Sequence, residues 1–165
     1  MYTPELLKEL ARQGAQLTFE HFDLEDAYAL GTKLRKKAVE VSLSIAVRIV
    51  LNGLIVYQTF LPGTGMENDF WMNLKYATVA QSHKSSLRTA AERELLGITE
   101  SWQEDENSHA FCGGGFPLIV GGMYSGAVVV SGLPHVQDHE LVVQAITEYL
   151  REQAEKESAD ISFIP

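Results

Sequence analysis

The amino-acid sequence predicts an α+β fold, in which helices pack on a mainly antiparallel sheet. Two pairs of apolar, strand-like segments are the first observation, and a dipeptide typical of a tight hairpin joins each pair, Asn52-Gly53 and Gly121-Gly122. The second observation is that apolar residues recur at helical spacing before, between and after these pairs. The expected order is therefore helix, helix, strand pair, helix, helix, strand pair, helix.

Two helices are expected before the first strand. Thr3-Pro4 is typical of a helix start, and Gly14 stands where a left-handed residue would end that helix. Asp23 is a good cap for the second helix, whose apolar residues keep helical spacing as far as Val41.

Residues 44–60 predict the first hairpin, and a two-residue loop at Asn52-Gly53 fixes its register. The face expected to meet the core holds the pairs Leu51 with Leu54, Ile49 with Val56, and Ile45 with Phe60. The opposite face pairs Arg48 with Tyr57, and Ala46 with Thr59.

Residues 68–97 predict two consecutive helices, because the polar run from Ser82 to Ser86 competes with helical hydrogen bonding. An acidic surface loop is expected over residues 98–111. Residues 116–120 and 123–131 predict the second hairpin. Asp138 is expected to cap a final helix that reaches about Glu155.

Composition and charge narrow the class of protein. The 165 residues suit one domain, with an N-terminal helical extension over residues 1–20, a core over 21–155 and a tail over 156–165. A net charge of −9, with 13 Lys and Arg, argues against nucleic-acid binding. The sequence has no apolar run of about 18 residues, no signal-peptide pattern and one cysteine, so we expect a cytoplasmic protein that neither spans nor binds a membrane.

Two segments carry a family resemblance, residues 112–122 (CGGGFPLIVGG) and residues 126–134 (GAVVVSGLP). At these segments the chain resembles the haem-degrading-domain superfamily, which includes GlcG-like and HbpS-like proteins and the C-terminal domain of PduO. It is most similar to a branch with no settled activity. The motifs of that branch are Leu61 to Thr64, Trp71 with Lys75, His83 to Ser86, and Asp138 to Val142. The resemblance implies a profilin-like sandwich. Since some relatives bind haem and form oligomers, it also implies a homo-oligomer and makes haem a candidate cofactor, with the cofactor itself left unassigned.

The preferred polar cluster is His83 with Ser85 and Ser86, which adds a titratable ring to the expected helix break. Trp71 and Lys75 lie earlier on the same helix and could complete a ligand-facing patch, with a flat wall and a positive charge. If the ligand is haem, His83 is the natural axial ligand and Lys75 the partner of a propionate. The simpler alternative is that these residues only cap and break the helix.

The glycine run 113–115 precedes a strand rather than a helix, so it is not a phosphate-binding loop. Gly113, Gly114, Phe116 and Pro117 are instead interpreted as one wall of a pocket that faces the His83 cluster.

Three weaker patterns are also present. Free amides near Asp138 could hold an anion, although the Asp138 side chain could use them itself. His135 and His139 have metal-ligand spacing but no third ligand, so no metal site is expected. Cys112 has only His109 nearby in sequence as a base, and a buried structural cysteine is the preferred interpretation.

The sequence therefore predicts a self-associating domain that binds a small-molecule ligand, with haem and a small carboxylate as the two ligand classes. A protein-interaction scaffold without a small-molecule site is one alternative. An enzyme that acts on a small organic acid is the other, although the sequence nominates no catalytic residue.

Overall fold

The computed structural model describes residues 1–162. The helices are α1 (Pro4–Gln16), α2 (Leu24–Glu40), α3 (Met66–Ser82), α4 (Ser86–Leu96) and α5 (His135–Ser162), with a short 3₁₀ helix at Ser101–Glu104. The strands are β1 (Ala46–Leu51), β2 (Leu54–Phe60), β3 (Gly115–Val120) and β4 (Met123–Ser131). Among these residues no helix has the length and apolar character needed to cross a membrane.

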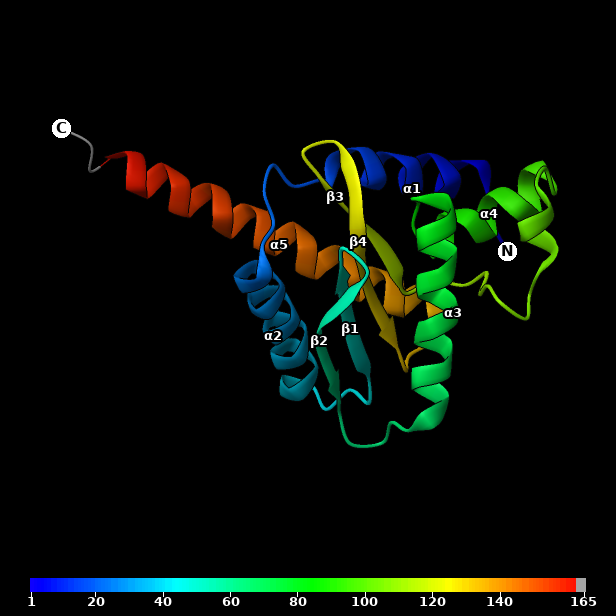
Figure 1. The fold of residues 1–165 in the computed structure, drawn as a ribbon, viewed down its shortest axis with the longest axis horizontal. Helices are drawn as coiled ribbons and strands as arrows, with labels where there is room; N and C mark the ends of the chain where they lie inside the picture. The colour runs from blue at the N-terminus through cyan, green and yellow to red at the C-terminus, as the bar shows by residue number, and fades with distance from the viewer. Residues whose placement is uncertain (163–165) are drawn as a thin grey trace.

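The four strands form one antiparallel sheet in the order β2-β1-β4-β3, so the two hairpins meet at β1 and β4. Helices α2 and α5 cover one face of the sheet, and α3 covers the other (Figure 1). Helix α1 packs on α4, through Leu10, Leu87 and Ala91. The predicted α+β sandwich of two hairpins and flanking helices is confirmed.

The larger core lies between the sheet and the α2–α5 layer. Because side chains alternate along a strand, every second residue from Ile45, just before β1, to Leu51 points into this core. Leu30 and Leu34 from α2 and Ile146 from α5 meet them there and are fully buried. The α3 face buries a smaller apolar cluster, made of Ala46, Met72, Val79, Ala127 and Val129.

The first hairpin has the predicted turn but not the whole predicted register. Leu51 pairs with Leu54 as expected, and the register then shifts between Ile49 and Val50, where β2 holds one extra residue. Beyond that bulge, every predicted pair within the strands is wrong by one position. The observed pairs are Ile49 with Tyr57, Arg48 with Gln58, Val47 with Thr59, and Ala46 with Phe60.

The helix boundaries agree with the sequence in the middle of the chain and differ at its ends. The break between α3 and α4 is confirmed: His83 ends α3 in the left-handed conformation (φ 60°), and Ser85 caps α4. Helix α1 continues past Gly14 to Gln16. Helix α5 starts three residues before Asp138, because the Pro134 carbonyl accepts the amides of Gln137 and Asp138. Asp138 therefore lies inside the first turn of α5, and the prediction that it caps the helix is wrong.

Candidate functional site

A cavity of about 320 Å³ lies where α3 passes the end of β4 and the first turn of α5. Its walls include Trp71 and Lys75 from α3, Ser131 at the end of β4, and His135 and Asp138 from α5. Cys112 and Asn68 also line the cavity. The cavity thus draws on both helical layers at one end of the sheet.

A buried ion pair forms the floor of the cavity. The Lys75 ammonium group donates to the Val130 carbonyl (2.9 Å) and to Asp138 Oδ2 (3.1 Å), and the two charged residues are only 3% and 1% exposed. Asp138 Oδ1 accepts the backbone N–H of Leu133 at 3.0 Å. Among the described residues Lys75 has these two partners, which leaves one ammonium N–H for the cavity.

The titration of the neighbouring groups reflects this burial. Loss of solvent raises the pKa of the Asp138 carboxyl, although the Lys75 charge and the amides around it act in the opposite direction. Burial also raises the pKa of the Cys112 thiol, which the nearby Lys75 only partly offsets. A raised thiol pKa keeps Cys112 protonated, and this is the opposite of what a cysteine nucleophile needs.

The glycine run allows the chain to pass close to both α3 and α5. A Cβ atom on Gly114 would lie 2.4 Å from the Val130 carbonyl oxygen and 2.7 Å from Lys75 Nζ, and its φ of 132° also favours glycine. A Cβ on Gly113 would lie 2.3 Å from the His135 carbonyl oxygen. These glycines hold the backbone behind the ion pair rather than lining the cavity.

His135 has one ring nitrogen fixed by the same glycine run. The Gly113 N–H donates to His135 Nδ1 at 3.0 Å, so the neutral ring carries its proton on Nε2. Burial lowers the pKa of His135, and the Lys75 charge lowers it further. The Nε2–H group therefore remains a donor at neutral pH.

Some of the residues nominated from the sequence line the cavity, and the others lie outside it. Trp71 and Lys75 line the cavity, whereas the other seven nominated residues are not among its lining residues. His83 is exposed, and its ring stacks on Tyr124 at 4.1 Å between centroids. Ser85 caps α4 by accepting the Arg88 amide, and Ser86 Oγ accepts the Gly115 amide at 2.9 Å. His83 and Lys75 therefore do not share this cavity.

Phe116 and Pro117 belong to β3, and Phe116 is 1% exposed within the large core. They support the sheet beneath the glycine run, and the prediction that 113, 114, 116 and 117 form a wall of the pocket does not hold for this cavity, which none of the four lines. Ser131, His135 and Asp138 are among the eight cavity residues that the predicted site omitted. These residues come together because the glycine run passes close to the start of α5. A single sequence does not reveal this approach.

His135 and His139 do not form a metal site in the described part of the chain, where no cluster of three potential ligands occurs. His139 Nε2 lies 2.8 Å from Gln13 Oε1 and ties α5 to α1. Burial lowers the pKa of His139 to about 4, so this ring is neutral near pH 7.

Comparison with known proteins supports the same fold. The model of the family described as haem degrading protein HbpS-like matches residues 22–147. The chain belongs to this family. Within the HbpS-like family it is 37% identical over 150 residues to a UPF0303 protein from Streptomyces avermitilis, covering 89% of this chain and 92% of that one. A UPF0303 protein from Rhizobium meliloti is also 37% identical, over 147 residues that cover 87% and 90% of the two chains.

Solved structures of similar proteins have the same architecture. The Ybr137w protein superposes with a TM-score of 0.80 at 25% identity, covering 90% of this chain and 89% of that one. HbpS gives a TM-score of 0.64 at 20% identity over 79% and 90% of the chains. A haem complex of PduOC gives 0.67 at 17% identity over 76% and 93%. The last two likenesses show the HbpS-like fold alone.

Proposed function

We propose that this chain is a binding domain for a small carboxylate, held in the cavity above the Lys75–Asp138 pair. The observation that carries the proposal is the buried Lys75 ammonium group, whose third N–H has no partner among the described residues. A carboxylate would accept that hydrogen bond and a second one from His135 Nε2–H, and charge-assisted hydrogen bonds of this kind are strong in a poorly solvated site.

Haem is the second candidate, because the similar PduOC structure is a haem complex. The residues fit a haem poorly in the arrangement predicted from the sequence. Lys75 would have to leave its buried partner Asp138 to meet a propionate, and His83 lies exposed against Tyr124 outside the cavity. Titration of haem into the full chain tests this candidate. We expect no shift of the Soret band that depends on His83. A shift seen with the wild type and lost in His83→Ala would support haem as the ligand.

Thermal unfolding in the presence of short monocarboxylic and hydroxy acids tests the carboxylate proposal, because a ligand that binds only the folded chain raises its Tm by mass action. The carboxylates should raise the Tm of the wild type and of Lys84→Met, but not that of Lys75→Met. The corresponding amides should have no effect.

Lys75→Met could fail to fold, so His135→Phe provides a second variant, with the exposed His21→Phe as its control. His135→Phe should weaken the response and His21→Phe should keep it. Equal responses to acids and amides, or no response to any acid, would overturn the proposal. The absence of any response would favour a protein-interaction scaffold.

We also propose that the chain self-associates through the edge of the sheet. Strand β2 is an edge strand, and it presents Leu54 and Ile55 to solvent at 65% and 53% exposure. Unpaired edges with exposed apolar residues favour pairing with another chain. Light scattering of the purified protein should show an oligomer that Ile55→Lys converts to a smaller species, and a monomeric wild type would contradict this.

A further inference from the structure

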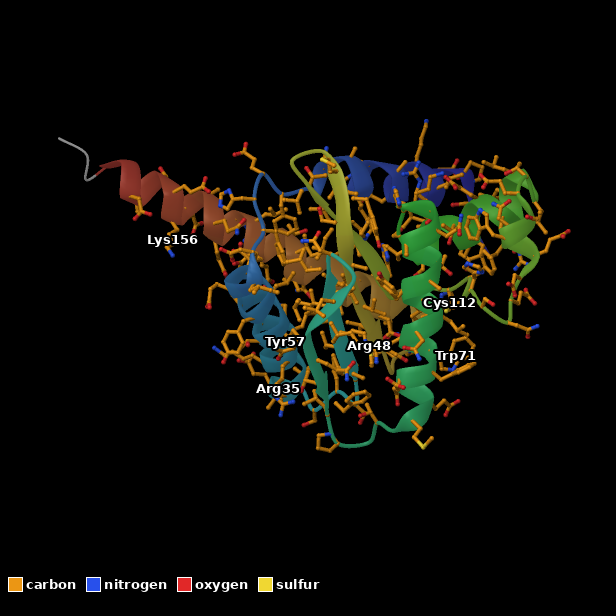
Figure 2. The ribbon with its side chains drawn as sticks, in the orientation of Figure 1. Arg35, Arg48, Tyr57, Trp71, Cys112 and Lys156 are labelled. Carbon is orange, nitrogen blue, oxygen red and sulfur yellow. The ribbon has the colours of Figure 1, made fainter. Side chains whose placement is uncertain are left out.

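A second cavity adjoins the one above the ion pair. It has a volume of about 300 Å³, and Trp71 and Cys112 line both cavities. Figure 2 shows these two side chains on the same side of α3. The two cavities are therefore neighbours, and a ligand that occupied both would pass Trp71 and Cys112.

The second cavity is bounded by aromatic rings. Phe111 lines it, and Trp102 stacks behind Phe111 with centroids 5.9 Å apart and planes 20° apart. Trp71, which is 39% exposed, also lines this cavity and is shared with the first one. Aromatic rings favour stacked or edge-to-face contact with a planar group, and such contacts contribute beyond the area that they bury.

The charges in the second cavity are already paired. The Arg93 guanidinium lies 2.9 Å from Glu106 and 4.3 Å from the centre of the Phe111 ring. A second negative charge on the ligand, carried into the second cavity, would meet the Glu106 carboxylate, and the Arg93 cation there is already paired with Glu106. The two cavities together suit one carboxylate attached to one apolar, planar group.

We infer that the ligand is an aromatic monocarboxylic acid, with its carboxylate at Lys75 and its ring in the second cavity, in contact with Trp71 and Phe111. This inference rests on the proposed function and specifies the ligand class. It separates the roles of the two cavities: the first supplies the charge-assisted hydrogen bonds, and the second supplies the apolar contact.

Calorimetric titration with acetate, phenylacetate, phenylacetamide and 4-carboxyphenylacetate tests the inference on the full chain. Phenylacetate should bind roughly tenfold more tightly than acetate, a difference of about 1.4 kcal/mol that ring burial and stacking supply. The amide lacks the charge and the dicarboxylate carries a second one, so both should bind more weakly than phenylacetate.

Phe111→Leu separates the two cavities, since Phe111 lines only the second of them. This variant should weaken phenylacetate binding severalfold and leave acetate binding within about twofold. Phe60→Leu is the matched control, because Phe60 is an exposed aromatic residue of β2 that lines neither cavity. The control should leave both affinities unchanged.

The single cysteine of the chain gives an independent readout. Because Cys112 lies in the shared wall, bound phenylacetate should slow its alkylation by iodoacetamide, measured by mass spectrometry at mildly alkaline pH. If acetate binds but phenylacetate binds no better and does not protect Cys112, the inference fails while the proposed function stands. If no carboxylate binds at all, the proposed function fails too. Tighter binding of the dicarboxylate would overturn the assignment of a single carboxylate.

Discussion

The two faces of the sheet bury different kinds of side chain. The face under α2 and α5 is closed by a continuous apolar core, in which Leu30 and Ile146 are fully buried. The face under α3 buries charged groups as well: Arg48 contacts Asp69 and Asn73 of α3, and Lys75 reaches Asp138. The apolar face supplies most of the stability, whereas the α3 face carries the groups that can recognise a ligand.

The ion pair at Lys75 should therefore be the most sensitive point of the polar face. Lys75→Met leaves the Asp138 carboxyl buried beside an apolar group, and we expect a loss of about 3–5 kcal/mol in the free energy of unfolding, as for other broken buried pairs. Urea unfolding measures this loss. Adding Asp138→Leu should recover much of it, because the second change removes the unpaired group. A loss below about 1 kcal/mol in the single variant would contradict a structural role for the pair.

The glycine run should respond nearly as strongly. Gly114→Ala places a methyl group against the Val130 carbonyl and Lys75 Nζ at a positive φ, so we expect a loss of about 3 kcal/mol. Gly53→Ala is the matched control, because Gly53 has a positive φ of 80° but no atom lies within 4 Å of the position that a Cβ would take there. Backbone strain alone should cost that control about 1 kcal/mol. Equal losses in urea unfolding would show that close packing at Gly114 is unimportant.

The buried ring of His139 should make stability depend on pH. Its folded-state pKa of about 4 lies below the unfolded value of 6.5, so the folded state favours the neutral ring. The resulting stability is fully present above pH 6.5 and is lost as the pH falls towards 4. The loss amounts to about 3 kcal/mol.

Urea unfolding between pH 7 and pH 4 measures this effect. His139→Leu should make the free energy of unfolding depend less on pH over this range. His21→Leu, at an exposed histidine, should leave that dependence unchanged. If His139→Leu retains the full wild-type slope, another group is responsible.

The sequence was sufficient for the elements but not for the site. Asn52-Gly53 and Gly121-Gly122 both mark real hairpin turns, because positive φ angles are a local requirement that residue type reveals. The bulge in β2 is not encoded in the alternation of side chains that predicted the register, and α5 starts early because its first helical bonds go to the Pro134 carbonyl rather than to a cap at Asp138. Lys75 and Trp71 were nominated through the family resemblance, whereas their partner Asp138 was assigned to a helix cap.

The smallest expected change in stability concerns the helix break at His83, which could be a helix cap alone or part of a ligand site. Ser85 Oγ accepts the Arg88 amide and so caps α4, and Ser85→Ala should cost about 1 kcal/mol in urea unfolding. If Ser85 acts only as a cap, this variant should bind phenylacetate with wild-type affinity once it is folded, as should His83→Asn, which tolerates the left-handed conformation. A loss of affinity in both variants would instead place the ligand at the α3–α4 break. That outcome would move recognition away from Lys75 and Asp138, to the solvent-exposed His83 ring stacked on Tyr124.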